Sequence, residues 1–531
     1  MVSIVGLIAV AALVYFAVRD FRRYLALRQF KGPPLSGFTR YWVYKASTSG
    51  RSTCRVGPNT LLTKDISVIK RINAVRSEYG RADWYKAIRL HPTEDNITVS
   101  SAPLLLYFAF HRSRADPFTQ TYMDDNVHTK IRQAMAPGYS GKENQYIEKD
   151  IDATLLKMMV LIQTKYLSTP TKYVPLDLAR TSTFFTLDTI STVAFGRTFG
   201  FLDKDGDPFN YLEQGKTLWP FVMGIATFPE LHNIVRIPAV RALWPSASDA
   251  QGLGAIMSFA NAVVAERFDP VAPVTRRDML GSFLAHGLTR TQLESETLIQ
   301  ITAGSDSTAT AIRIALLHIA TNPRILRTLL AELSGAAAAG RLSRPIITDQ
   351  QARALPYLQA CIKESLRIVP PAAGLLPKRV PAGGDVIDGR AVPGGTAVGW
   401  NVFGLMRDAA VFGPDAHLFR PERWLLADAA ALARMADAQA AVFGAGKHGC
   451  LGRSVAMFEL DKAVAELVLR FEWEVADPQR PFKGVCMGFF LQEDMFFRVT
   501  ERKADGGETG LEGLGLEGKR DYGMETVWED L

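Results

Sequence analysis

The sequence is poor in cysteine, with only Cys54, Cys361, Cys450 and Cys486 among 531 residues. Four scattered cysteines exclude a secreted disulfide framework and a structural zinc site, which needs closely spaced Cys and His pairs. Long blocks of Lys and Arg are also missing, so the net charge of +7 does not indicate a nucleic-acid-binding protein. Because no Gly-rich dinucleotide fingerprint is present, no flavin or nicotinamide held by this chain is predicted.

The composition is that of a large globular protein, with 47% hydrophobic and 22% charged residues and no internal repeat. We treat residues 35–503 as one catalytic domain. Helical spacing dominates, and short strand-like pieces lie at 52–63, 386–398 and 484–500, where Gly, Pro and β-branched residues gather. The sequence therefore predicts a mainly α fold with small β-sheets.

The amino terminus carries an uncharged run of 17 residues, Val2 to Val18, which as a helix just spans a bilayer core of roughly 30 Å. Basic residues follow this run, whereas a cleaved signal peptide, the alternative, carries its charge ahead of it. We expect residues 1–20 to form a single transmembrane anchor, with the basic, Pro-rich hinge 21–34 on the cytoplasmic side. This predicts a single-pass protein of the endoplasmic reticulum membrane with a cytosolic catalytic domain.

The carboxyl end, residues 504–531, is rich in Gly and acidic residues. From Asp505 onward it holds eight acidic residues against Lys519 and Arg520, together with seven glycines. Such a composition cannot bury enough apolar surface to fold, so we expect a disordered tail.

A long helix is predicted from near Thr291, where Thr291 and Glu294 have capping-box spacing, to Thr321 before Asn322-Pro323. Its apolar stripe is interrupted by the small polar run Ala303-Gly304-Ser305-Asp306-Ser307-Thr308. Glycine in a helix costs about 1 kcal/mol relative to alanine. The run therefore indicates a functional segment, with a polar face at a packing kink as the alternative.

The most specific motif is Phe443-Gly444-Ala445-Gly446-Lys447-His448-Gly449-Cys450-Leu451-Gly452, directly before a segment with helical spacing. Glycines let this backbone fold tightly and aim N–H groups at the sulfur, and the positive end of a helix favours a thiolate. A cysteine so placed is suited to ligate haem iron. The alternative is a buried structural cysteine after a turn.

This loop resembles the haem-binding signature of the cytochrome P450 family of haem-thiolate monooxygenases. The resemblance implies that Cys450 is the axial ligand of haem b and that Phe443, Gly446 and Gly452 shape the cofactor-binding loop. It also implies that Glu364, Arg367 and Arg423 form a structural, non-catalytic triad, although an exposed i,i+3 pair is the ordinary explanation of Glu-x-x-Arg. The resemblance runs from the anchor to about residue 500 and is closest to fungal members, on features such as Pro421-Glu422-Arg423-Trp424.

The resemblance further points to basic residues that would hold the haem propionates. His448 stands where the signature more often has arginine, and His128 and Arg132 match the Trp-x-x-x-Arg helix with histidine in place of tryptophan. Arg379 is a further candidate. A solvated surface charge is the alternative for each.

In the long helix, the resemblance implies that Gly304 makes room for dioxygen. Asp306 and Ser307 would relay protons to it, with Thr308 able to share the task. Splitting O₂ requires protons, so an acid beside a hydroxyl is a sensible arrangement. Ser307 departs from the usual threonine, which predicts less strict coupling of oxygen use to product.

The expected substrate is a lipophilic small molecule, because the segments that would line its pocket by resemblance are largely apolar: 100–110, 221–229, 299–303, 371–376 and 487–491. We predict a monomeric monooxygenase that uses O₂ and takes electrons from NADPH through a separate cytochrome P450 reductase, docked near Lys447 and Arg453. The expected role is tailoring of a polyketide, terpenoid or alkaloid in fungal secondary metabolism. Two alternatives remain: a reductase-independent haem-thiolate isomerase or dehydratase, and a non-enzymatic membrane haem sensor or carrier.

Overall fold

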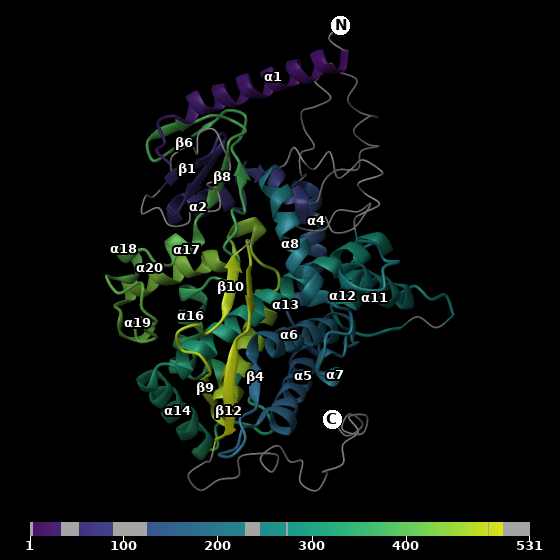
Figure 1. Ribbon diagram of the computed structural model, residues 1–531, viewed down its shortest axis with the longest axis vertical. Coiled ribbons are helices and arrows are strands. Elements are labelled where there is room, and N and C mark those ends of the chain that lie inside the picture. Colours follow the sequence, from purple (N-terminus) through teal and green to yellow (C-terminus); the bar gives the residue numbers. More distant parts are fainter. Residues whose placement is uncertain are drawn as a thin grey trace.

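The computed structural model describes residues 4–32, 53–88, 125–228, 245–271, 274–486 and 488–502. The predicted tail 504–531 and the candidate substrate segment 100–110 lie outside these ranges, as do the last two residues of the predicted hinge, 33–34. Within the described residues the chain is mainly helical with small β-sheets, as the sequence predicts (Figure 1).

Helix α1 (Ile4–Leu27) lies across one end of the molecule, above strands of a small sheet (Figure 1). The helix continues through the first seven residues of the predicted hinge and ends at Leu27. Leu27 and Phe30 are buried among apolar residues of helix α2 (Ile66–Asn73) and strand β8 (Ala397–Trp400). None of the helices in the described part of the chain is apolar over a length sufficient to traverse a bilayer, so the predicted transmembrane helix is not confirmed.

The strands of the described residues form four small sheets. The largest has the order β1-β2-β8-β5-β3, in which β2 and β8 are parallel and the other pairs are antiparallel. A second sheet has the order β4-β12-β9, and the pairs β6-β7 and β10-β11 complete the set. The further strand bounds are β1 (Thr53–Gly57), β2 (Thr60–Thr63), β3 (Gly80–Arg81), β4 (Pro175–Asp177), β5 (Lys378–Arg379), β6 (Asp385–Ile387), β7 (Arg390–Val392), β9 (Phe471–Val475), β10 (Lys483–Cys486), β11 (Phe490–Glu493) and β12 (Phe496–Glu501). All three predicted strand regions therefore contain strands.

The helical body surrounds the long helix α13 (Arg290–Ala320), which packs against α6 (Leu178–Phe195), α11 (Gly252–Arg267), α16 (Pro356–Ile368) and α21 (Arg453–Arg470). The remaining helices are α4 (Asp125–Tyr139), α5 (Ile147–Leu161), α7 (Phe201–Lys204), α8 (Tyr211–Thr227), α12 (Met279–Ala285), α14 (Pro323–Ala338), α15 (Asp349–Arg353), α17 (Val402–Leu405), α18 (Ala409–Phe412), α19 (Arg423–Leu426) and α20 (Ala429–Ala440). Short helical turns lie at η3 (Asp83–Ile88), η4 (Ile162–Tyr166), η6 (Ala441–Phe443) and η7 (Gly446–His448).

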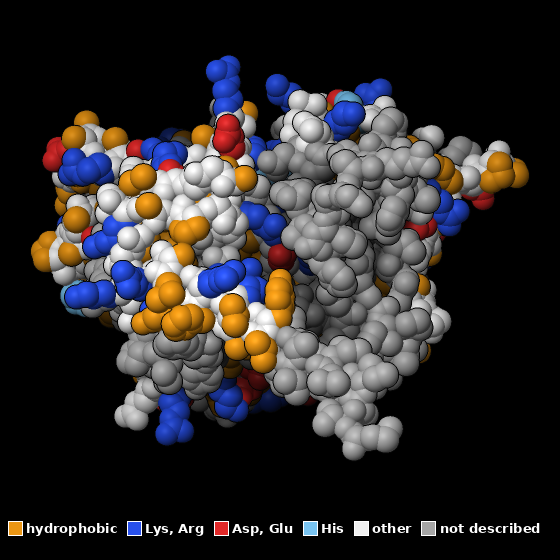
Figure 2. Space-filling view, turned by 90° about the horizontal axis from the view of Figure 1, so that it is seen from above, with side chains coloured by type: hydrophobic (Ala, Val, Ile, Leu, Met, Phe, Trp, Pro, Cys, Tyr) orange, Lys and Arg blue, Asp and Glu red, His pale blue; other side chains and the backbone are white. Residues whose placement is uncertain are grey.

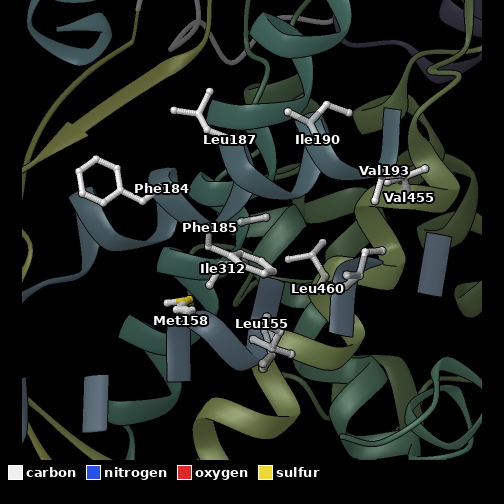
Figure 3. Packing of buried hydrophobic residues seen from close by; sticks show 14 of the residues in the cluster. Leu155, Met158, Phe184, Phe185, Leu187, Ile190, Val193, Ile312, Val455 and Leu460 are labelled. Carbon is white, nitrogen blue, oxygen red and sulfur yellow. The ribbon is translucent and has the colours of Figure 1, made fainter. Parts of the chain in front are cut away.

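The main apolar core lies where these central helices meet. Figure 3 shows Phe185 and Leu187 of α6, Ile312 of α13 and Leu460 of α21 among its side chains. Burial of such side chains removes apolar area from water, worth roughly 25 cal/mol per Å², and fixes α13 between the helix that follows the cysteine loop and α6.

The predicted N-cap of α13 is wrong. Thr289, not Thr291, is the N-cap, and its capping box is closed by Gln292 rather than Glu294. Both pairs have the required three-residue spacing, and Arg290 and Thr291 already have helical geometry. The predicted end holds, because α13 stops at Ala320 with Thr321 as its C-cap before Asn322-Pro323.

Candidate functional site

The cysteine loop is folded as a tight turn directly before α21. The Cys450 N–H donates to the carbonyl of Phe443 over 2.7 Å, which closes the loop. Gly446 has φ +57°, and a Cβ there would lie 1.8 Å from the Asn73 carbonyl oxygen at the end of α2. A glycine is therefore required at 446 because the loop backbone packs directly on α2.

The Cys450 sulfur is bound by the start of α21. The backbone N–H groups of Gly452 and Arg453 donate to it, and the positive charges of Arg132 and Arg453 lie near it. Burial raises the pKa of the Cys450 thiol, and these groups oppose that rise without overcoming it. The start of α21 thus favours the thiolate, as the sequence predicts, but its effect on the pKa is smaller than that of burial. A coordinating metal cation deprotonates a thiol outright.

The predicted loop residues play different parts. Gly452 is the N-cap of α21, and a side chain there would lie 3.9 Å from the Cys450 sulfur. Phe443 is half-buried, and the Arg453 guanidinium lies over its ring, 5.4 Å from the centroid. Lys447 donates from Nζ to the Ser77 carbonyl over 2.9 Å, while Arg453 is exposed.

Three of the four predicted propionate partners meet beside the loop. Arg132 of α4 donates from Nη1 to the Gly449 carbonyl over 2.7 Å. His128, one turn earlier, is buried, and its ring centroid lies 4.7 Å from that of His448. The fourth candidate, Arg379 of β5, instead forms an ion pair with Asp83 of η3 at 2.8 Å.

The polar run of α13 has one open face, and residues beside it in the helix are buried. Ala303 is exposed and Ser307, one turn later, is partly exposed, whereas Ile301, Thr302 and Ala309 are buried. Ser307 Oγ donates to the Ala303 carbonyl over 2.7 Å. Burial raises the pKa of Asp306, and the Arg313 guanidinium on the same helix opposes the rise.

Gly304 and Thr308 have other surroundings. A Cβ on Gly304 would lie 3.2 Å from Ile190 Cγ1, so the missing side chain lets α13 pack closely on α6. This contact gives Gly304 a packing role, and the space for dioxygen stays a prediction. Thr308 is only 3% exposed, so the structure does not bring its hydroxyl to the open face that Ser307 occupies.

Glu364, Arg367 and Arg423 come together in a fully buried network. Arg367 binds both oxygens of Glu364 at 2.8 Å, and Arg423 Nε donates to Oε1 over 3.0 Å. The motifs did not reveal two further members: Trp424 Nε1, which donates to Glu364 Oε2 over 2.9 Å, and Asp415, which pairs with Arg423 at 3.1 Å. Trp424 stood within the quoted Pro-Glu-Arg-Trp motif, whereas nothing in the local sequence marks Asp415.

Three of the five candidate substrate segments meet near α13. Ala373 N donates to the Gly488 carbonyl over 2.8 Å, and Ala372 forms an isolated β-bridge with Phe489. A Cβ on Gly488 would lie 3.2 Å from Met223 Sδ of α8. Thr310 of α13 donates to the Phe490 carbonyl over 3.4 Å, so these segments border the long helix.

The residues around Cys450 fit a haem group with iron. Cys450 is a free, exposed cysteine, although protein surrounds it closely enough that desolvation is the main influence on its pKa. A thiol that is open on one side and bound by two backbone N–H groups on the other has the donor set of an iron-thiolate ligand. Cys450 would bind the iron, and Arg132, His128 and His448 are the nearby candidates for the propionates.

Fold and site together define a protein of the haem-thiolate class. The sequence profile of cytochrome P450 matches residues 106–495, and the chain belongs to this family. It is an enzyme of the cytochrome P450 monooxygenase family, whose members use haem and O₂.

Fungal relatives are similar over nearly the whole chain. Cytochrome P450 monooxygenase ABA1 of Pyricularia oryzae is 35% identical over 518 residues, 94% of this chain and 96% of that protein. Cytochrome P450 monooxygenase aba1 of Botryotinia fuckeliana is 35% identical over 492 residues, 90% of this chain and 92% of that protein. Cytochrome P450 monooxygenase abl1 of Leptosphaeria maculans is 31% identical over 501 residues, 90% and 84% respectively.

Proposed function

We propose that the protein oxidises a lipophilic small molecule, inserting one atom of O₂ into a C–H bond with electrons from NADPH delivered by a separate reductase. The observation that carries the proposal is the environment of Cys450, an exposed residue whose sulfur accepts hydrogen bonds from the N–H groups of Gly452 and Arg453. Haem iron with a thiolate ligand supplies the electron density that favours O–O cleavage.

The chain's own residues orient the cofactor and move protons. Gly452 and Arg453 donate hydrogen bonds to the Cys450 sulfur and so tune how much charge it gives to a metal. Asp306 would pass on protons, since burial raises its pKa and so favours the protonated carboxyl, and the Ser307 hydroxyl lies on the open face of α13 where a proton is needed.

The apolar segments that meet near α13 favour a lipophilic substrate. Met223, Ala372, Ala373 and Phe489 belong to segments that meet near α13, and burial of an apolar ligand against them is favourable by roughly 25 cal/mol per Å². The identified fungal relatives support a role in fungal secondary metabolism, as the tailoring of a polyketide, terpenoid or alkaloid skeleton.

Reductase docking would use the basic residues of the cysteine-loop face. Arg453 is exposed there, and its positive charge is complementary to an acidic partner surface. Lys447 is the weaker candidate, because its Nζ already donates to the Ser77 carbonyl.

We also propose that the amino-terminal helix anchors the protein in the endoplasmic reticulum membrane, with the catalytic domain in the cytosol. The uncharged run Val2 to Val18 and the basic residues after it support this orientation. The end of the molecule that carries α1 presents hydrophobic and basic side chains together (Figure 2), and Tyr15 and Phe21 of α1 are exposed. Removal of residues 1–27 should move the protein from the membrane to the soluble fraction.

Turnover with defined components tests the reaction. The full chain is incubated with candidate lipophilic metabolites and O₂, with and without NADPH plus reductase, and products are identified by mass spectrometry. Product that gains one oxygen atom only when NADPH and reductase are both present supports the proposal. Product formed equally without them indicates the isomerase or dehydratase alternative and contradicts it.

A further inference from the structure

Helix α1 carries a stripe of apolar residues that is exposed to solvent. Val14, Val18, Phe21 and Leu25 follow one another at intervals of four, three and four residues, and they are between 43% and 56% exposed. Because an α-helix turns by about 100° per residue, these four side chains lie along one face, which we call the apolar stripe. Leu27, on the opposite side of the helix, is fully buried. The stripe therefore faces away from the rest of the protein.

Three of the four charged residues of α1 lie on the half of the helix opposite the apolar stripe. Arg19 and Asp20 form an ion pair at 2.9 Å, and Arg23 approaches the same carboxylate at 3.5 Å. All three are only partly exposed. A helix on the surface of a soluble protein has the reverse arrangement, with its polar residues outward and its apolar residues toward the core. The arrangement of α1 is that of a helix whose outer face contacts lipid.

The end of α1 and the residues after it are fixed to the folded domain. Phe30 is 1% exposed in the apolar cluster that contains residues of α2 and β8, and the Arg390 guanidinium of β7 lies 5.5 Å from its ring centroid. The Arg55 guanidinium of β1 lies 4.7 Å from the ring centroid of Tyr24, and Arg55 Nη1 donates to the Tyr24 carbonyl over 3.4 Å. These contacts fix the direction of the apolar stripe relative to the domain.

The part of the chain that carries the stripe is also basic. Residues 19–31 contain five basic residues against Asp20, and Arg22, Arg28 and Lys31 among them are exposed. On the end of the molecule that carries α1, hydrophobic side chains lie beside Lys and Arg side chains (Figure 2). Acidic phospholipids attract Lys and Arg to a membrane surface. An apolar stripe bordered by positive charge thus matches the acyl chains and the phosphates of a bilayer that contains acidic lipids.

We propose that the second half of α1 lies along the surface of the membrane, with the apolar stripe among the acyl chains and the basic residues at the headgroups. The helix crosses one end of the molecule instead of projecting from it (Figure 1), so its fixed end turns this end of the domain toward the bilayer. The inference rests on the proposed membrane location and deepens it. It gives α1 a direction parallel to the membrane in place of the spanning direction that the sequence predicts.

Spin-label depth measurements test the proposal on the full-length holoenzyme in vesicles of phosphatidylcholine and phosphatidylserine. Val14→Cys, Val18→Cys, Phe21→Cys and Leu25→Cys each receive a nitroxide, and wild type treated with the same reagent gives the background of the native cysteines. Val75→Cys, at an exposed residue just after α2, is the control in water. The four labels should have equal depths, about 5–10 Å into the boundary between headgroups and acyl chains. A depth that changes steadily by about 16 Å from residue 14 to residue 25 indicates a spanning helix and overturns the proposal. Labels that stay in water, as at Val75, also overturn it.

Binding to the same vesicles tests the proposal without a label. Phe21→Ser combined with Leu25→Ser removes the part of the stripe that follows the uncharged run, and should weaken binding by about tenfold or more. Val75→Ser is the matched control and should bind as the wild type does. Unchanged binding of the double variant, which a spanning helix predicts, contradicts the proposal. Flotation of the wild type with the vesicles reports the proposed membrane location, and NADPH-dependent product reports the proposed reaction, so failure of either is distinguished from failure of this inference.

Discussion

Arg367 donates two parallel hydrogen bonds of 2.8 Å to Glu364, from Nε to Oε2 and from Nη2 to Oε1, and neither side chain is exposed to solvent. The remaining donors of Arg367 reach the carbonyls of Met406, Ala416 and Leu418, far along the chain. One arginine thus fixes helix α16 to the segment that leads toward the cysteine loop.

Replacement Glu364→Gln should destabilise the protein strongly. It removes the charge that compensates Arg367 and Arg423, and breaking a buried ion pair typically costs about 3–5 kcal/mol. The matched control is Glu266→Gln, since Glu266 forms an exposed pair with Arg197 at 2.7 Å and such pairs contribute about 0–1 kcal/mol. Chemical denaturation followed by tryptophan fluorescence measures both. Similar losses of unfolding free energy in the two variants would contradict the expectation that the buried network stabilises the fold more than the exposed pair does.

Replacement Gly446→Ala should disrupt the cysteine loop. The new Cβ would lie 1.8 Å from the Asn73 carbonyl, on a backbone with φ +57° that alanine disfavours. Gly335→Ala is the control, because Gly335 lies within α14 with open space around it, and alanine in a helix is more stable by about 1 kcal/mol. The melting temperature and the haem content after purification should both fall in Gly446→Ala and be kept in Gly335→Ala. Full haem content in Gly446→Ala would refute the close packing of the loop on α2.

Replacement Ser307→Ala should reduce the share of consumed O₂ that ends in product. It removes the hydroxyl on the open face of α13, and we expect product per NADPH to fall by about tenfold or more, since a positioned proton donor contributes roughly 10²–10⁴-fold. Thr308→Val is the control, because Thr308 is buried on another side of the helix. Product and hydrogen peroxide are measured together. A larger loss of product per NADPH in Thr308→Val than in Ser307→Ala would show that Thr308, rather than Ser307, serves the proton relay.

Asp461 should make stability depend on pH. Burial raises its pKa to about 7, although a hydrogen bond from Gln359 over 2.8 Å opposes the rise. Because the folded pKa is above the unfolded value of about 3.9, the folded state binds the proton more tightly. Stability from this group is present at low pH and is lost as pH rises from about 4 to 7, by up to about 1.4 kcal/mol per pH unit. Asp461→Asn should make the free energy of unfolding depend less on pH across this window. Asp437→Asn, at an exposed site, should leave that pH dependence unchanged.

Local patterns in the sequence predicted the elements that carry the site. The extent of α13 followed from apolar spacing and Asn322-Pro323, and the turn before α21 followed from its glycines. The N-cap was misplaced because Thr289 and Thr291 satisfy the same spacing rule, and only the folded backbone distinguishes them. Such errors arise where two neighbouring residues are chemically equivalent.

Contacts between distant segments were not predictable in this way. Arg313 stands between Ile312 and Ile314, and nothing nearby indicates that Ser182 and Ala179, 131 and 134 residues earlier, accept its hydrogen bonds. The need for glycine at 446 likewise comes from Asn73, and Gly304 serves packing on Ile190. The motif identified the candidate site, whereas the electrostatic surroundings of that site depend on tertiary structure.

The most direct test is the absorption spectrum of the reduced, carbon monoxide-bound protein, because the account depends on the sulfur of Cys450 ligating haem iron. The full-length wild type should show the red-shifted Soret band of thiolate ligation, and Cys450→Ala should lose this band and the NADPH-dependent product. Cys361→Ala, at a buried cysteine distant in sequence from the loop, is the matched control and should keep both. A Cys450→Ala protein with an unchanged spectrum and undiminished product formation would contradict the account.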